Sequence, residues 1–347
     1  MNTKQVVGFA CSYTPLALIN AAGFSHYRVL PDADCPDQAG SLLHDNLCPH
    51  IKGILDRAMS DRVPDLAGMV FLNSCDAMRR LHDAWMKARP GTRSVLIDLP
   101  PTTNDASVGF FRDELDRLAG TLVDWGGTAP DGKSLTRGIG LNNAIAESLS
   151  ALRDRQRAGT LRNGSAALQE AYNRASTGPM EETITFLESL LAETAANNGR
   201  GVPLYLFGNV MPDPEAFTLI EECGARIVCE DMCTGSRVFT RITMDREDAL
   251  YCMARDTIRD RPCARTMDER RPGRIADDLV MMARECGARG IIGYTVKFCD
   301  PYIARMPHVR ELLKKEGIPF LHLEGDCTMR SMGQHRTRIE AFIEMLG

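Results

Sequence analysis

The sequence predicts an α/β protein with two parallel-sheet domains and a helical segment between them. Short apolar runs alternate with helical patterns along most of the chain, and one central stretch contains no convincing strand. Strands that alternate with helices form βαβ units, which build parallel sheets. We therefore place an N-terminal α/β domain at residues 1–133, a helical segment at 134–200 and a C-terminal α/β domain at 201–347.

Seven apolar runs predict buried strands, because they are short and are bounded by turn residues. In chain order they are V-V-G-F-A (6–10), L-A-G-M-V-F-L (66–72), R-S-V-L-I-D-L (93–99), P-L-Y-L-F-G-N (203–209), R-I-V-C-E-D (226–231), G-I-I-G-Y-T-V (290–296) and P-F-L-H-L-E (319–324). The first three fall in the N-terminal domain and the last four in the C-terminal domain.

Helical patterns lie between these strands. Residues 15–22 follow the first strand, and residues 76–87 carry apolar side chains at helical spacing. The last helix gathers four apolar residues on one face, namely Ile339, Phe342, Ile343 and Leu346. The central segment is interpreted as helices that break at Gly159, at Asn163-Gly164 and at Gly178-Pro179, and N-N-G-R-G (197–201) has the composition of a linker.

The composition excludes several classes of protein. The chain has 347 residues, 44% of them hydrophobic, and a net charge of −5, so a broad basic face for nucleic acid is not expected. No apolar run approaches the roughly 18 residues of a membrane span, and the N-terminus lacks the pattern of a signal peptide. We expect a cytoplasmic protein that binds neither nucleic acid nor membrane.

Twelve cysteines need an explanation. A cytosolic compartment disfavours structural disulfides, and free cysteine is often a small buried hydrophobe, so packing is the simplest interpretation. The positions favour another one, because open α/β sheets bind ligands outside the carboxyl ends of their strands. Five cysteines follow a predicted strand within a few residues: Cys11, Cys75, Cys233, Cys299 and Cys327.

Cys48, Cys75 and Cys299 also stand where helices are expected to begin. Pro49 suits the first helical position, and an aspartate follows each of the other two cysteines. A helix N-terminus lowers the pKa of a thiol, so these positions favour a thiolate, which is a metal ligand or a nucleophile. Soft thiolates favour iron–sulfur clusters, zinc or copper(I), and the spacing alone does not choose among them.

Other motifs are weak or missing. No C-x-x-C, P-loop, G-x-G-x-x-G or H-E-x-x-H occurs, so no ATP or dinucleotide site is expected in this chain. We interpret Cys223, Cys229 and Cys286 as packing residues, since one lies within a strand and the others near helix ends. His50 is interpreted as a solvated or hydrogen-bonded core histidine. Ser12 is interpreted either as a helix cap or as a hydrogen-bond donor to a ligand, and no catalytic residue is assigned.

Six stretches resemble a known family, the 2-hydroxyacyl-CoA dehydratase D-component superfamily, which includes benzoyl-CoA reductase subunits and double-cubane cluster proteins. The stretches span nearly the whole chain in order: A-C-S-Y-T-P-L-A-L-I-N-A-A-G (10–23), N-L-C-P-H-I-K (46–52), N-S-C-D-A-M-R-R-L-H-D-A-W (73–85), D-M-C-T-G-S-R (231–237), V-K-F-C-D-P-Y (296–302) and G-Q-H-R-T-R-I-E-A-F-I-E-M-L (333–346). The resemblance implies two Rossmann-like or flavodoxin-like domains with an oxygen-sensitive iron–sulfur cluster between them.

The resemblance also implies the cluster ligands, in two alternative forms. In the dehydratase branch, Cys48, Cys75 and Cys299 match the three ligands of a [4Fe-4S] cluster with one open iron. In the double-cubane branch, Cys11, Cys233 and Cys263 supply three further thiolates for an [8Fe-9S] cluster. Both branches remain open on the sequence.

The resemblance implies a function as well. It implies radical dehydration of a 2-hydroxyacyl-CoA after one-electron reduction by a separate ATP-hydrolysing iron–sulfur activator, which makes the chain a lyase or an ATP-dependent reductase. Expected partners are that activator, a related subunit or a second copy in a dimer, and an acyl-CoA. The alternatives are a double-cubane reductase of small molecules, a non-catalytic electron-transfer or scaffold subunit, and a cluster-free α/β binding protein.

Overall fold

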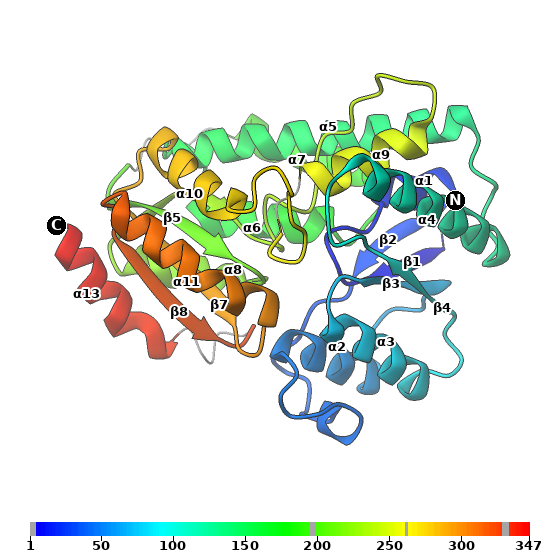
Figure 1. Cartoon of the computed structure of the whole chain (residues 1–347), viewed down its shortest axis with the longest axis horizontal. Helices are drawn as coiled ribbons and strands as arrows, with labels where there is room; N and C mark the ends of the chain where they lie inside the picture. Colours follow the sequence, from blue (N-terminus) through cyan, green and yellow to red (C-terminus); the bar gives the residue numbers. More distant parts are fainter. Residues whose placement is uncertain (1–4, 194–198, 261–262, 328–332) are drawn as a thin grey trace.

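The structure of the chain, a computed structural model, describes residues 5–193, 199–260, 263–327 and 333–347. It confirms an α/β protein with two four-stranded parallel sheets separated by a helical segment (Figure 1). The N-terminal sheet has the order β2-β1-β3-β4 and contains β1 (Val6–Phe9), β2 (Ser25–Arg28), β3 (Gly68–Asn73) and β4 (Ser94–Asp98). The C-terminal sheet has the order β6-β5-β7-β8 and contains β5 (Val202–Gly208), β6 (Ala225–Asp231), β7 (Gly290–Val296) and β8 (Phe320–Gly325).

The two sheets share one topology. In each sheet the first strand in sequence lies between the second strand and the third, and the fourth strand pairs with the third. The third strand of each sheet leads into a helix through a Cys-Asp pair. In the N-terminal sheet β3 leads into α3 (Asp76–Ala88), and in the C-terminal sheet β7 leads into α11 (Asp300–Lys315). Cys75 and Cys299 therefore occupy equivalent places in the two halves.

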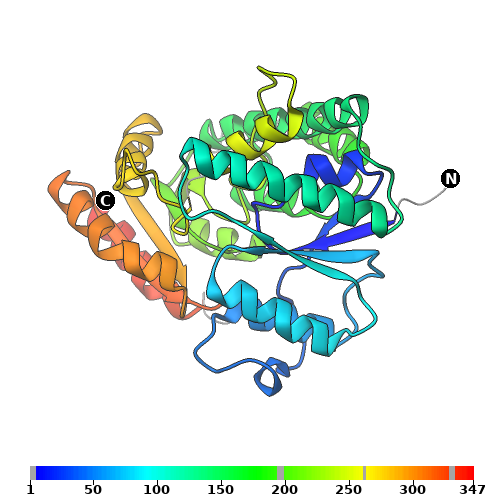
Figure 2. The same ribbon diagram turned by 45° about the vertical axis from the view of Figure 1, so that its right-hand side comes forward.

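Helices cover both faces of each sheet. Figure 2 shows α2 (Pro49–Met59) and α3 below the N-terminal sheet and α4 (Asp105–Asp124) above it, where α1 (Leu16–Ala21) also lies. In the C-terminal half, α10 (Arg274–Glu285) packs beside α11, and α13 (Arg336–Leu346) packs beside α8 (Pro214–Glu222). Short 3₁₀ turns occur at Ala39–Ser41 and at Gly333–His335.

The central segment is helical, as the sequence predicts. It consists of α5 (Gly132–Arg157), α6 (Gly164–Ala175) and α7 (Met180–Ala192). Gly159 (φ 71°) and Asn163 (φ 60°) lie in the left-handed region between α5 and α6, which explains why the helix breaks there. The predicted linker at 197–201 falls partly outside the described residues.

The two halves contact each other through α9 (Ala249–Arg259). This helix belongs to the C-terminal half by sequence but packs on α4 of the N-terminal half (Figure 1). Arg112 Nε lies 3.1 Å from Asp248 Oδ2 across this contact. One apolar core joins the two helices to the N-terminal sheet and to the central helices. The predicted boundaries between the domains stay a prediction.

All seven predicted strands are present, and β2 is an addition that the sequence analysis missed. Its residues S-H-Y-R are polar, yet Ser25, His26 and Arg28 are all buried. His26 Nε2 lies 2.8 Å from the carbonyl oxygen of Ala175, in the central segment. The polar side chains of β2 are therefore stabilised by distant parts of the chain, which a local apolar pattern does not reveal.

No helix in the described parts of the chain combines the length and the apolar character that crossing a bilayer requires.

Candidate metal centre

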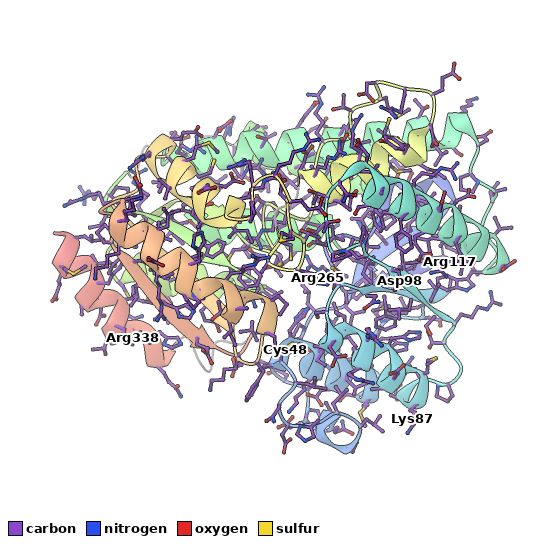
Figure 3. The ribbon with its side chains drawn as sticks, in the orientation of Figure 1. Cys48, Lys87, Asp98, Arg117, Arg265 and Arg338 are labelled. Carbon is purple, nitrogen blue, oxygen red and sulfur yellow. The ribbon has the colours of Figure 1, made fainter. Side chains whose placement is uncertain are left out.

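Six cysteines from the two halves line one small cavity of about 110 Å³. The cavity lies where the carboxyl ends of the two sheets meet, and Figure 3 labels Cys48 and Arg265 at this junction. The six are the residues that the sequence analysis names as cluster ligands: Cys11, Cys48, Cys75, Cys233, Cys263 and Cys299. The structure brings the whole set together, and metal binding by these residues stays a prediction.

Three of these cysteines, which we call the first triad, precede helices. Cys48 is the N-cap of α2, Cys75 that of α3 and Cys299 that of α11, so the predicted helix starts are confirmed. Pro49 takes the first position of α2, where a missing N–H costs no hydrogen bond. Asp76 and Asp300 lie in the first turns of their helices, where the positive end of the helix dipole stabilises a carboxylate.

Burial raises the pKa of every thiol in the first triad, to about 12 for Cys75 and for Cys299. Backbone N–H groups of the first helical turns lower these pKa values, but burial outweighs them. Repulsion between charged sulfurs acts between Cys75 and both other members, and between Cys299 and Cys48. The prediction that these positions favour thiolates is therefore wrong, because burial outweighs the helix N-termini. A bound cation would compensate the charge of the thiolates.

The other three cysteines form the second triad. Cys11 follows β1, Cys233 follows β6, and Cys263 follows α9. Burial raises the pKa of Cys11. A hydrogen bond from the Cys263 thiol lowers the pKa of Cys233, and the charges of Arg237 and Arg28 lower it further. Negative charge in the second triad is therefore favoured on Cys233, beside two guanidinium groups.

Arg237 fixes the position of Cys233 in the second triad. Its Nε lies 2.5 Å from Asp231 Oδ1, and its Nη2 donates to Asp231 Oδ2 at 2.7 Å. Nη1 donates to the carbonyl oxygen of Gly208 at 3.0 Å and lies 3.5 Å from Cys233 Sγ, and it also reaches the hydroxyl of Tyr302. The Arg237 side chain is 4% exposed, so this network holds Cys233 rigidly against the cavity.

Arg28 brings a second buried positive charge to the cavity. It is 2% exposed, and it donates to the carbonyl oxygens of Ala10 at 3.2 Å and of Cys233 at 2.7 Å. No carboxylate of the described chain forms an ion pair with it. Burial lowers the pKa of Arg28, and the sulfurs of Cys233 and Cys11 are the negative groups that oppose this shift. A buried guanidinium needs nearby negative charge, so Arg28 favours an anionic site.

Asn209 connects the two triads. It follows β5, and its carbonyl oxygen accepts the N–H of Cys233 at 2.6 Å. Its side-chain oxygen accepts the N–H groups of Val210 and Val296, each at 3.0 Å. Burial raises the pKa of Cys299, and a hydrogen bond from the Asn209 side chain opposes that rise. Sequence analysis missed Asn209, Arg28 and Arg237. Arg28 and Asn209 act through contacts between distant parts of the chain, and Arg237 adds contacts with the distant Gly208 and Tyr302 to its local pair with Asp231.

His50 differs from the prediction. It lines the cavity and is 8% exposed, but its Nδ1 has no hydrogen-bond partner in the described chain. Burial lowers the pKa of His50 to about 3, and the charge of Arg28 contributes, so the ring is neutral at pH 7. The interpretation as a hydrogen-bonded core histidine is therefore wrong. A buried unpaired nitrogen beside a cavity is typical of a residue that contacts a ligand.

The structure also places the other residues that the sequence analysis names. Cys229 lies within β6, and Cys223 and Cys286 are the C-caps of α8 and α10, outside the cavity. Cys327 follows β8 and is buried, but it does not line the cavity. Ser12 does line the cavity, and the N-cap of α1 is Pro15, so the capping role for Ser12 is wrong.

Within the described residues, no three His, Cys, Asp or Glu side chains are close enough to hold a single metal ion.

A family model described as 2-hydroxyglutaryl-CoA dehydratase, D-component, matches residues 11–346. The chain belongs to this D-component family. The resemblance drawn from the six motifs is thereby confirmed, and all six cysteines of the cavity lie within the matched residues.

Curated relatives of this D-component protein match it at low identity over most of its length. The (R)-phenyllactyl-CoA dehydratase beta subunit of Clostridium sporogenes is 23% identical over 99% of this chain and 92% of the relative. The lactoyl-CoA dehydratase beta subunit of Anaerotignum propionicum is 24% identical over the same shares. A benzoyl-CoA reductase subunit of Thauera aromatica is 20% identical over 92% of this chain and 85% of the relative.

Proposed function

We propose that this chain is the iron–sulfur component of an ATP-driven, low-potential reductase or dehydratase system, and that its six-cysteine cavity holds a double-cubane cluster. The observation that carries the proposal is the convergence of Cys11, Cys48, Cys75, Cys233, Cys263 and Cys299 on one cavity. A single open cubane uses three thiolates, which would leave three buried sulfurs of the same cavity without a role.

The residues of the cavity fit such a group. Thiolates are the ligands that iron–sulfur clusters use, and the first and second triads supply three each. Arg28 lacks a carboxylate partner within the described chain, and a cluster held by thiolates supplies the negative charge that it needs. His50 has an Nδ1 at the cavity that no described residue pairs, which suits a hydrogen bond to a bound group.

The residues around the triads have three tasks. Arg237 and Asn209 hold Cys233 and Cys299 in position through backbone and side-chain hydrogen bonds. Arg28 and Arg237 stabilise negative charge, and the apolar walls at Val210 and Val296 exclude water. A cluster, when bound, supplies low-potential electrons for reduction of a substrate.

The chain has no P-loop, so the ATP-dependent step belongs to a separate activator protein. The relatives are named as subunits, which supports assembly with a related subunit or a second copy.

The test is the content of iron and acid-labile sulfide per chain in protein purified without oxygen. We expect about eight irons, with a loss of iron in Cys→Ser variants of both triads. Cys35→Ser and Cys223→Ser serve as controls, because both are partly exposed and lie outside the cavity. Protein without iron after anaerobic reconstitution, but with the same fold by circular dichroism, would contradict the proposal and favour packing cysteines.

The second candidate is dehydration of a 2-hydroxyacyl-CoA on a single [4Fe-4S] cluster, and the names of two relatives favour it. It assigns the cluster to Cys48, Cys75 and Cys299 alone. About four irons, unchanged by Cys11→Ser, Cys233→Ser and Cys263→Ser, would support this candidate over the double cubane. Phenyllactyl-CoA and lactoyl-CoA, tested with an activator and ATP, are then the first substrates to assay.

A further inference from the structure

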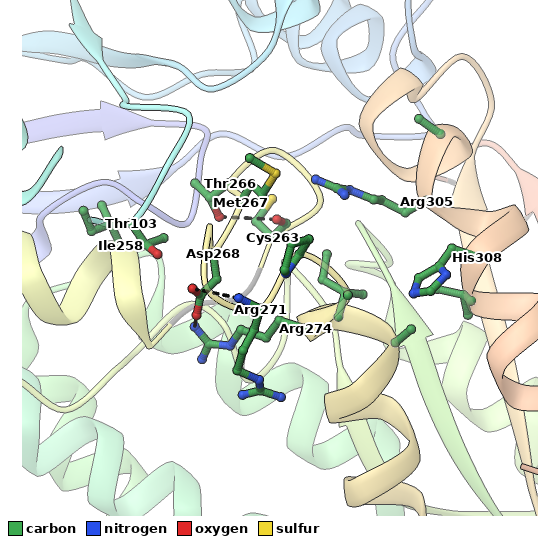
Figure 4. Close-up of a pocket in the computed structure, with 16 residues that line it drawn as sticks. Thr103, Ile258, Cys263, Thr266, Met267, Asp268, Arg271, Arg274, Arg305 and His308 are labelled. Atoms are coloured by element: carbon green, nitrogen blue, oxygen red, sulfur yellow. Dashed lines mark hydrogen bonds and ion pairs between the residues drawn. The ribbon is translucent and has the colours of Figure 1, made fainter.

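A second pocket adjoins the six-cysteine cavity, and Cys263 lines both. Its volume is about 340 Å³, within the roughly 300–1,000 Å³ of pockets for small ligands. The pocket lies between the loop after Cys263, the start of α10 and one face of α11 (Figure 4). We call it the side pocket.

The charges of the side pocket do not balance. Arg271 and Arg274 are compensated, because Asp278 lies 2.8 Å from Arg271 Nη2 and 3.1 Å from Arg274 Nε. Asp268 lies 4.0 Å from Arg274 Nη1. Arg305, from α11, has no hydrogen bond or ion pair within the described chain, and Figure 4 shows it extending toward the loop that carries Cys263. One positive charge of the pocket is therefore uncompensated by the described residues.

Two further features border the pocket. The first turn of α10 lines it without a capping side chain at Gly273, although the N–H groups of Arg274 and Ala276 already donate to the carbonyl oxygens of Arg271 and Gly273. His308 is exposed at the pocket and makes no hydrogen bond to the described chain, and its Nε2 and the Asp277 carboxylate both lie beside Gly273. The remaining lining is largely apolar, including Ile258 and Ile275.

We infer that the side pocket binds a small organic anion, with a carboxylate or phosphate head at Arg305 and His308 and a short apolar body directed toward Cys263. The planar guanidinium of Arg305 matches either head group in a bidentate manner. Anion binding rests on the side pocket alone, whereas a role for the anion as substrate rests on the proposed function, because Cys263 is the link to the cavity.

The experiment titrates the cluster-free full-length chain with butyrate, butyl phosphate and butylamine by isothermal calorimetry. We expect butyrate or butyl phosphate to bind at millimolar concentration or below and butylamine not to bind. Arg305→Gln should weaken binding about tenfold or more, because it removes a charge-assisted hydrogen-bond pair. Lys314→Gln, on the exposed side of the same helix, removes the same charge and should bind like the unaltered chain.

Absence of anion binding, equal binding of butylamine, or an unchanged affinity in Arg305→Gln would overturn the anion site. A second measurement tests the role as substrate, with the EPR spectrum of the iron-loaded chain recorded with and without the anion that binds. A spectral change that Arg305→Gln abolishes supports that role, and an unchanged spectrum overturns it. If no cluster assembles, the proposed function fails, while the calorimetric result on the anion site still stands.

Discussion

Replacing Arg237 by methionine should destabilise the cluster-free chain by about 3–5 kcal/mol. The change breaks a buried ion pair, in which two Arg237 nitrogens lie 2.5 and 2.7 Å from the Asp231 carboxylate. It also leaves the carbonyl oxygen of Gly208 and the hydroxyl of Tyr302 without this donor. We expect the lower end of the range, because the Asp231 side chain is 21% exposed and water can replace part of the interaction.

Two control variants allow this loss of stability to be interpreted. Arg336→Met breaks an ion pair with Glu222 whose side chains are 42% and 56% exposed, so we expect at most about 1 kcal/mol. Arg237→Lys keeps the positive charge but lacks the planar guanidinium. Its loss of stability should therefore fall between those of Arg237→Met and Arg336→Met. The measurement is urea unfolding at pH 7 followed by circular dichroism. A loss below about 1 kcal/mol in Arg237→Met would refute the structural role of this network.

Three further predictions concern β2, β5 and the pH dependence of the fold. Arg28→Met should lower the iron retained per chain after anaerobic reconstitution, because it removes a buried cation that no carboxylate of the described chain pairs. An iron content equal to that of the unaltered chain would contradict a charge-balancing role. Gly208→Ala should destabilise the fold by about 3 kcal/mol, since the new Cβ would lie 2.0 Å from the carbonyl oxygen of Tyr294, and equal urea midpoints would contradict this. Burial lowers the pKa of His26 from 6.5 to about 4, so its contribution to stability is complete above pH 6.5 and is lost as the pH falls toward 4. His26→Gln should therefore reduce the loss of stability between pH 7 and pH 4 by about 3 kcal/mol, and parallel pH profiles of the two chains would rule this out.

The sequence predicts most of the fold, because buried parallel strands are apolar along their whole length. β7 is buried at every position, and its run G-I-I-G-Y-T-V is recognisable without any structure. β2 has no such pattern, since its buried polar groups depend on partners in the central segment and at the end of β1. A strand whose polar residues are paired at long range lies beyond local pattern analysis.

The residues of the candidate site also divide into those with a local sequence pattern and those without one. The cysteines are recognisable because a thiol at a strand end or a helix start has a local signature, as at Cys75 and Cys299. Arg28, Asn209 and His50 have no such signature. The position of Arg28 matters because Cys233, more than two hundred residues away, lies against it. Such groups become visible when the fold brings the carboxyl ends of both sheets together.

The two triads have a consequence for biogenesis. The first triad has two cysteines in the N-terminal half and one in the C-terminal half. The second triad has one cysteine in the N-terminal half and two in the C-terminal half. Neither half contains a complete triad. If the proposed cluster binds all six thiols, its assembly has to wait until Cys299 has been synthesised and both halves have docked, and the bound cluster would then resist separation of the halves.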